Sequence, residues 1–392
     1  MTTSRSFVFL PALRLLGWLL APALFIHAAE AAEPQWKTIF YKRTFMGALE
    51  VKPKGSAVGT TVRMPVYIPV KAEKIRVWVR SDFDVPIEFS RMAFVRASGN
   101  GGAVEATPVP LLFDGKPGVM LARRDPHSCM AEAAAAFSPG LWYLETYYTS
   151  AKCSYAYDGE GGFTAPDDSL ANAGIRFRPS NVYVGNAYRI EALTDDPAPV
   201  IVCYGDSITQ GAGSTRMSGN NYPHLLGRLL NRPAVNLGVH SDLLIHAGMA
   251  ADLSGRMKGA SDLIFLMGIN DIAWGGQIKN AADYASRVGA IVADAKKRGL
   301  KTYIGTIMPA GGLKIFDKNP AKEALRQEIN AWIRKQTRAD GVIDFDAALR
   351  DPKDPVRLRA DYQCGDWIHP SDAGYQKMAE TAAEVLKSAS KS

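Results

Sequence analysis

The chain has 392 residues, of which 47% are hydrophobic and 22% are charged, and its formal net charge is +7 at pH 7. This composition excludes a disordered chain, and the length allows two domains, each with a core of its own. The basic residues are scattered rather than interleaved with aromatic side chains, so a solvated basic surface is favoured over a nucleic-acid partner.

The N-terminal stretch has the pattern of a secretory signal peptide. Arg5 and Arg14 precede an apolar run over residues 15–26, and small residues follow as far as Ala31 and Ala32. A positive start, a short apolar segment and small residues at the cleavage site are typical of such a peptide. A membrane anchor is the alternative, but the run is short and contains glycine and proline. We expect cleavage near Ala31 or Ala32 and a secreted or periplasmic protein without a stable membrane anchor.

Export to an oxidising compartment makes disulfide bonds possible among the four cysteines. A bridge between Cys129 and Cys153, both in one turn-rich region, would stabilise the fold by roughly 3 kcal/mol in the chain-entropy model. Cys203 and Cys364 are interpreted as free thiols, with a bridge near the active site as the alternative.

The first half of the mature chain shows the signals of short strands. Apolar and polar residues alternate between turn-rich clusters in residues 60–70, 75–80, 87–97, 140–149 and 186–193. The alanine-rich residues 129–137 predict one helix among them. Together these segments predict a β-sandwich or jelly-roll-like domain over residues 33–193, after a signal peptide over residues 1–32.

The second half alternates strands and helices. The acidic, proline-rich residues 194–199 predict a linker, and an α/β domain follows over residues 200–392. Strands are predicted at residues 200–204, 234–237, 263–267, 302–307 and 342–344, and helices at 222–230, 281–298, 321–338 and 372–387. Strands separated by helices predict a parallel sheet covered on both faces.

The residues that carry chemistry follow these strands. Ser207 comes directly after the buried strand 200–204, at the strand end where open α/β sheets bind ligands, which makes it the candidate nucleophile. A helix cap is the alternative role for such a serine. A serine nucleophile needs a base and an acid that orients the base. Asp366 and His369, three residues apart before the last helix, are spaced to form that pair locally.

Further candidates complete a site at the same edge of the sheet. Gly238 and Asn270 each follow a strand, and such donors can stabilise an oxyanion by roughly 3 kcal/mol each; Asn270 could instead only form a turn. His240 and Trp274 are candidates to line the substrate cleft, and a packed surface aromatic is the alternative for Trp274. His240 and His246 lack an acidic partner pattern, so no metal ligand is assigned and no cofactor is expected.

In this order, the motifs resemble those of the SGNH/GDSL hydrolase superfamily. They are GDS at residues 205–207, NLG at 236–238, GIND at 268–271 and DWIH at 366–369, and the resemblance covers residues 200 to about 387. It implies a flavodoxin-like three-layer α/β domain that uses Ser207 as nucleophile, His369 as general base and Asp366 as the acid that orients it. The implied oxyanion hole consists of the Ser207 and Gly238 N–H groups and the Asn270 side chain.

The N-terminal half carries no motif that we can assign, although some carbohydrate esterases of this superfamily have a jelly-roll module before the catalytic domain. The resulting hypothesis is an exported serine ester hydrolase for small acyl esters, with acetyl the expected group, on a small-molecule or polysaccharide substrate. Two alternatives stay open: a lysophospholipase or short-chain lipid esterase, and a carbohydrate-binding or surface protein with a relic hydrolase domain. The sequence leaves the oligomeric state open.

Overall fold

The computed structural model describes residues 33–43, 55–56, 58–80, 86–98, 104–105, 107–122, 129–150, 152–153, 162–170, 172, 174–180 and 187–389. The expected signal peptide and its cleavage site lie outside these residues, and so does the side chain of Cys153 in the expected bridge to Cys129. Residues 33–392 form one compact unit. None of the helices in the described ranges has the length and apolar character needed to cross a membrane.

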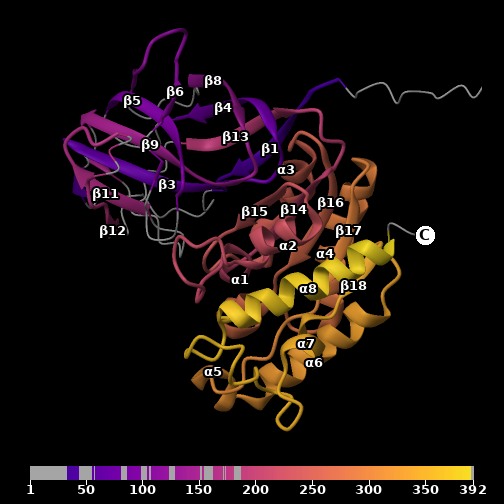
Figure 1. The fold of residues 1–392 in the computed structure, drawn as a ribbon. Helices are drawn as coiled ribbons and strands as arrows, with labels where there is room; N and C mark the ends of the chain where they lie inside the picture. The colour runs from indigo at the N-terminus through magenta and orange to yellow at the C-terminus, as the bar shows by residue number, and fades with distance from the viewer. Residues whose placement is uncertain are drawn as a thin grey trace, which may run out of the picture. The chain divides into compact units, whose positions relative to one another are not determined.

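The first half of the described chain forms two antiparallel sheets (Figure 1). One sheet contains, in spatial order, β1 (Gln35–Tyr41), β13 (Ala187–Thr194), β4 (Ala72–Val79) and β8 (Cys129–Phe137). The other contains β12 (Arg178–Ser180), β11 (Gly162–Pro166), β3 (Thr60–Ile68), β9 (Gly140–Ser150), β5 (Ile87–Arg96) and β6 (Val109–Leu111), with β7 (Val119–Leu121) also paired to β5. A short pair joins β2 (Gly55–Ser56) to β10 (Lys152–Cys153).

The two sheets share one hydrophobic core. Val77 of β4 and Ile190 of β13, from the first sheet, belong to the same buried cluster as Phe94 of β5 and Leu144 of β9, from the second. Buried and partly exposed residues alternate along β4, as a strand with one face on a core requires. The predicted β-sandwich is therefore confirmed.

The helix predicted for residues 129–137 is wrong, because this segment is strand β8. It pairs antiparallel with β4, where Ala131 lies opposite Val77 and Ala133 opposite Ile75. Ala131 and Ala133 point into the core and are at most 1% exposed. Alanine favours helices by intrinsic propensity, but pairing and burial on the sheet outweigh so weak a preference.

The second half is an α/β domain with a five-stranded parallel sheet. The strand order is β15 (Ala234–Gly238), β14 (Val200–Gly205), β16 (Ala260–Leu266), β17 (Lys301–Gly305) and β18 (Gly341–Ile343). Numbered in chain order within the domain, the strands follow the flavodoxin-like order 2-1-3-4-5. The second strand is added on one side of β14 and the later strands on the other, so the strand order reverses at β14. The carboxyl end of β14 is therefore the expected place for a ligand site.

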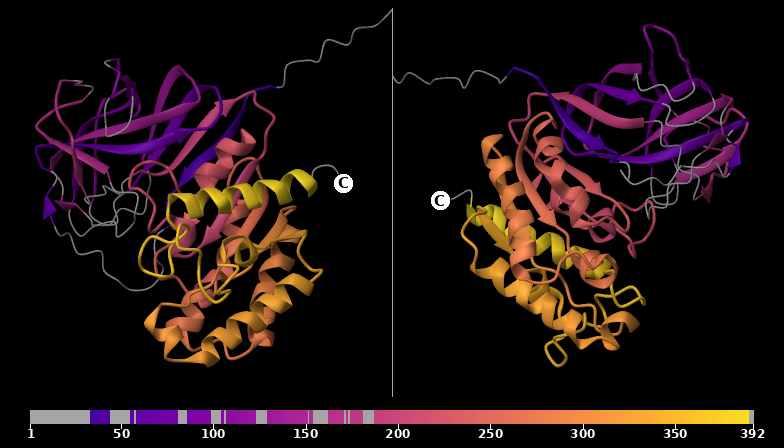
Figure 2. Two further views of the ribbon diagram at one scale, coloured as in Figure 1. Left: turned by 60° about the horizontal axis from the view of Figure 1, so that its bottom comes forward. Right: turned by 180° about the vertical axis from the view of Figure 1, so that it is seen from behind.

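Helices lie on both sides of this sheet (Figures 1 and 2). The pair α2 (Tyr222–Leu230) and α8 (Asp372–Ala389) packs together, while α4 (Ala281–Lys297) packs against α3 (Ala250–Gly255) and α6 (Pro320–Lys335). Shorter elements that the sequence did not predict are α1 (Ser207–Gln210), η1 (Leu244–Met249), η2 (Asp271–Gly275), α5 (Lys314–Asp317) and α7 (Phe345–Leu349). The expected three-layer α/β arrangement of this domain is confirmed.

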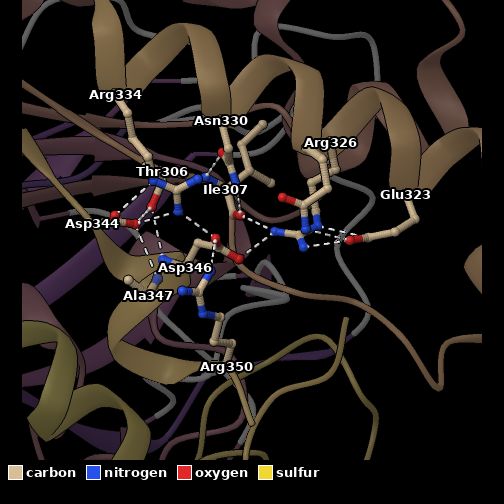
Figure 3. A network of polar contacts seen from close by, with 11 residues as sticks. Thr306, Ile307, Glu323, Arg326, Asn330, Arg334, Asp344, Asp346, Ala347 and Arg350 are labelled. Carbon is tan, nitrogen blue, oxygen red and sulfur yellow. Dashed lines mark hydrogen bonds and ion pairs between the residues drawn. The ribbon is translucent and has the colours of Figure 1, made fainter. Parts of the chain in front are cut away.

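A buried ionic network fastens α6 to the loops that follow β17 and β18 (Figure 3). The Arg326 guanidinium is fully buried and donates to the Ile307 carbonyl oxygen at 2.8 Å and to Asp346 Oδ1 at 2.7 Å. Glu323 accepts two further bonds from it at 2.6 and 2.8 Å. Arg334 reaches Asp344 and Asp346 from the same helix. This network fixes the edge of the sheet at which the candidate site lies.

The segment predicted as a linker has no regular secondary structure over residues 195–199. Lys37 Nζ donates to the carbonyl oxygens of Asp196 and Ala198 within it.

Two cysteines of the α/β domain are free thiols, as expected. Cys203 is buried in β14, and Cys364 is exposed.

Candidate active site

Ser207 occupies a sharp turn between β14 and α1. All six residues of β14 are buried, and Asp206 caps α1 by accepting a hydrogen bond from the Ile208 N–H at 2.9 Å. A Cβ on Gly205 would lie 1.9 Å from Thr209 Oγ1 and 2.6 Å from the Leu266 carbonyl oxygen, so this turn requires glycine. The turn places Ser207 at the first position of α1, beyond the carboxyl end of the strand.

Ser207, His369 and Asp366 form one hydrogen-bonded chain. Ser207 Oγ lies 2.8 Å from His369 Nε2, and His369 Nδ1 lies 2.5 Å from Asp366 Oδ2. The other carboxylate oxygen of Asp366 accepts the backbone N–H groups of Ile368 at 3.0 Å and His369 at 2.8 Å. The residues that the sequence predicted for a catalytic triad are thus brought together in the order that acyl transfer requires.

The surroundings of Asp366 favour its ionised form. Burial alone would raise the pKa of this carboxyl, but the His369 ring and the two backbone N–H groups outweigh burial and hold the pKa well below its usual range. An ionised carboxylate at this position fixes the imidazole with its proton on Nδ1 and leaves Nε2 to accept a proton from Ser207.

Two donors of the predicted oxyanion hole are positioned by helix starts. The Ser207 N–H belongs to the first residue of α1, where backbone donors have no partner within the helix. Asn270 lies between β16 and η2 and is 4% exposed, and its Nδ2 donates one N–H to the Asp242 carbonyl oxygen at 3.0 Å. The second N–H of this amide is available to bind a developing negative charge.

The third predicted donor, Gly238, is engaged elsewhere in the structure. Its N–H donates to Asn236 Oδ1 at 2.9 Å, and a Cβ at this position would lie 2.1 Å from the Gln210 nitrogen. Glycine is therefore required here for the close approach of α1. Three residues further on, Ser241 has a φ of 58°, a backbone conformation that is uncommon for residues other than glycine. Nothing in the sequence marks Ser241 for this conformation, because serine does not signal such a turn.

The two residues predicted to line the substrate cleft are both exposed. The His240 side chain is exposed, and its ring lies 6.3 Å from the His369 ring, centroid to centroid, with 25° between the ring planes. Trp274 is 58% exposed on η2, four residues after Asn270. His246 Nδ1 lies 2.8 Å from Asp242 Oδ1. Among the described residues, no group of three or more His, Cys, Asp or Glu side chains is placed to hold a metal ion.

Buried carboxylates beneath the site were not predicted as a group. Asp206, Asp242 and Asp271 are at most 3% exposed. Burial raises the pKa of Asp206 to about 7 and that of Asp271 to about 6, and repulsion from Asp242 adds to both shifts. Asp242 forms an ion pair with Arg43, a second residue that the sequence analysis missed.

The parallel sheet in flavodoxin-like order, with a serine, a histidine and an aspartate joined by hydrogen bonds beyond its strand ends, is the arrangement of the SGNH/GDSL hydrolases. Residues 203–377 match the GDSL-like Lipase/Acylhydrolase family. This part of the chain belongs to that family, and the protein is a carboxylic ester hydrolase.

Similar solved structures come from several bacteria. A lipolytic G-D-S-L protein from Veillonella parvula DSM 2008 is 18% identical, covering 48% of this chain and 98% of its own, with a TM-score of 0.37. The M. smegmatis aryl esterase is 15% identical and covers 49% and 99%, with a TM-score of 0.39. A protein from Bacteroides ovatus ATCC 8483, described as a GDSL-like lipase, is 14% identical and covers 88% and 89%, also with a TM-score of 0.39. No protein with a curated description matches the chain.

Proposed function

We propose that the protein is an exported serine esterase that removes small acyl groups, acetyl first among them, from carbohydrates. The observation that carries the mechanism is the hydrogen-bonded chain from Ser207 Oγ through His369 to Asp366. His369 Nε2 accepts the Ser207 proton while Oγ attacks the ester carbonyl carbon. The alcohol then leaves with that proton, and water, activated by the same histidine, releases the acid from the acyl-enzyme.

The negative charge on the carbonyl oxygen develops at the helix starts described above. The Ser207 N–H and the second N–H of Asn270 Nδ2 supply two donors to it. Asp366 stabilises the imidazolium that forms in each step. No step in this mechanism needs a metal or an organic cofactor.

The expected export, the β-sandwich and the exposed His240 and Trp274 side chains support a carbohydrate ester. Trp274, four residues after Asn270 on η2, is an exposed aromatic side chain, and His240 adds a polar group beside His369. Aromatic faces with nearby polar groups suit a ligand that is apolar on its ring faces and polar at its edges. The inference from the sandwich to a glycan rests on the architecture alone.

A lipid ester is the second candidate, favoured by one specific observation. The Leu244 N–H donates to the Asp271 carboxylate, so the starts of η1 and η2 adjoin. Ile245 on η1 is 46% exposed and Trp274 on η2 is 58% exposed, so both turns present apolar side chains near Asn270. A longer acyl chain would find apolar contacts there. The intact hydrogen-bonded chain weighs against the third reading, a binding protein with a relic site.

The test compares acetyl, butyryl and octanoyl p-nitrophenyl esters and acetate release from an acetylated polysaccharide. Ser207→Ala is expected to lose at least about 1,000-fold in kcat. The matched control Ser218→Ala, a partly exposed serine of the following loop whose hydroxyl donates to the Thr215 carbonyl oxygen, should keep full activity. Preference for acetyl supports the proposal, and preference for octanoyl supports the lipid candidate. Unchanged activity in Ser207→Ala would overturn the mechanism.

Localisation has its own test. The mature protein is expected in the periplasm or the medium, with an N-terminus that begins directly after Ala31 or Ala32. Mass spectrometry of the exported protein measures this N-terminus, and an intact N-terminal stretch in the membrane fraction would argue for an anchor instead.

A further inference from the structure

The sandwich reaches the hydrolase site through β1 and the residues that follow it. Along β1, the Thr38 N–H donates to the Lys258 carbonyl oxygen at 3.0 Å, and the Lys258 N–H donates to Thr38 Oγ1 at 2.9 Å. This strand contacts β15 and β14 of the parallel sheet. Two residues beyond the end of β1, the Arg43 side chain is only 6% exposed.

Arg43 joins the two backbone segments that flank the site. Its Nη2 lies 2.6 Å from Asp242 Oδ2 and donates to the Gly205 carbonyl oxygen at 2.8 Å, two residues before Ser207. Its Nη1 donates to the Tyr204 hydroxyl, and the guanidinium carbon lies 3.9 Å from the centre of the Tyr204 ring. One cation from the sandwich therefore holds the end of β14 against the turn after β15.

Asp242 passes this restraint on to the predicted oxyanion donor. Its carbonyl oxygen accepts the Asn270 amide at 3.0 Å, while its carboxylate binds Arg43, His246 Nδ1 at 2.8 Å and the Leu243 N–H at 3.0 Å. The Asp242 side chain is 3% exposed. Two contacts thus separate the Arg43 guanidinium from the Asn270 side chain.

The charges around Asp242 make Arg43 hard to replace. Asp206 and Asp271 are buried nearby, and removal of Arg43 leaves the buried Asp242 carboxylate with the His246 ring as its remaining side-chain partner in the described structure. An uncompensated buried charge is strongly unfavourable, and the loop that carries it moves toward water when it can. Movement of this turn shifts the carbonyl oxygen that orients Asn270.

We propose that Arg43 is a positioning residue of the esterase, which holds the Asp242 turn and through it the Asn270 amide in the geometry that binds the oxyanion. The inference rests on the proposed role of Asn270 in the same site. Arg43 itself does not touch the substrate. The N-terminal sandwich is accordingly part of the catalytic architecture, because it supplies this cation.

The test measures kcat, KM and inhibition by the trifluoromethyl ketone analogue of the best ester, which forms a tetrahedral adduct with a nucleophilic serine. Because a displacement of about 1 Å can cost roughly 100-fold in rate, Arg43→Met is expected to lower kcat by about 10- to 100-fold while KM changes less than about threefold. Affinity for the ketone should fall in parallel with kcat/KM. Arg43→Lys keeps the charge but loses the planar fork, so it should recover part of kcat.

The matched control is Arg232→Met. Arg232 is also partly buried, donates to the Pro199 carbonyl oxygen and pairs with Asp262, at the opposite end of the strands from Ser207. It should lower thermal stability and leave kcat of the folded protein within about twofold. If Arg43→Met fails to fold, the Arg43→Lys comparison still applies, with a several-fold loss of kcat expected.

The outcomes separate this inference from the proposed function. A full kcat in either Arg43 variant, or a raised KM with unchanged kcat, overturns the role of Arg43. Loss of activity in Ser207→Ala together with full activity in the Arg43 variants would leave the serine mechanism standing and remove only the positioning role. Full activity in Ser207→Ala would remove the proposed function itself.

Discussion

The Asn270 side chain donates to the Asp242 carbonyl oxygen over 3.0 Å, a contact that joins the loops after β16 and β15. Because an amide nitrogen carries two hydrogens in one plane, this bond fixes where the second N–H points. Preorganised donors of this kind need no reorientation when charge develops, and this is the source of their catalytic value. The contact therefore holds the Asn270 amide in one orientation before any substrate binds.

Asn270→Ala is predicted to lower kcat by about 100- to 1,000-fold with little change in KM, because it removes a donor that binds only the transition state. Steady-state kinetics on the best p-nitrophenyl ester measures both constants. Asn280→Ala is the matched control, since Asn280 also begins a helix and accepts the Asp283 N–H. This control should cost about 1 kcal/mol of stability and leave kcat unchanged. Equal kcat values for both variants would contradict the assignment.

Asp366→Asn is predicted to lower kcat by about 10,000-fold while the protein stays folded. The amide cannot accept the Nδ1 proton and bind the backbone N–H groups of Ile368 and His369 in the same way as the carboxylate, so the imidazole loses its orientation. Circular dichroism checks the fold, and kinetics over a pH range checks the rate. A loss of less than tenfold would show that another acid orients His369.

Asp206→Asn is predicted to flatten the dependence of stability on pH. Burial raises the pKa of Asp206 to about 7, so the native state keeps a proton that the unfolded chain loses near pH 4. The stability that this carboxyl contributes is complete below pH 4 and is lost as the pH rises through 7. The variant should thus gain on the order of 2–4 kcal/mol over the wild type between pH 4 and pH 8. Urea unfolding at several pH values measures it, and parallel curves for the two proteins would refute the shift.

Arg326→Met is predicted to destabilise the fold by about 3–5 kcal/mol, because it leaves Glu323 and the buried carboxylate of Asp346 short of a cation (Figure 3). Arg359→Met serves as the control, since the Arg359–Asp361 pair is exposed and its loss should not shift the unfolding midpoint measurably. The kcat of the folded fraction should be unchanged in both variants. Similar midpoints for the two would argue against the network as a source of stability.

The α/β half was predictable because its signals are local. Strand β14 is a run of buried, largely apolar residues, and helix α4 begins after Asn280 and ends before Arg298, close to the predicted limits. The sandwich was predictable as a class but not strand by strand. The segment 129–137 shows why: its alternation is carried by alanines, which mark neither a core face nor a solvent face, so only pairing with β4 decides it.

In the candidate site, too, residues that lie in local motifs were predictable, whereas residues that act through distant contacts were not. Ser207, Asp366 and His369 lie in short motifs whose residue types state their chemistry, and they meet in space as expected. Arg43 could not be predicted, because nothing local distinguishes it from other arginines; its role depends on a contact across nearly 200 residues of sequence, with Asp242. The engagement of the Gly238 N–H by Asn236 is likewise a matter of side-chain geometry.

The two free thiols give this fold a chemical reporter. Cys364 is exposed two residues before Asp366, whereas Cys203 is buried in β14, four residues before Ser207. A thiol reagent should therefore label Cys364 in the native protein and reach Cys203 only when the parallel sheet opens. The rate of the second labelling thus measures local opening at β14. Counting thiols in the denatured, unreduced protein adds a second result: two reactive groups indicate a Cys129–Cys153 bridge, and four indicate none.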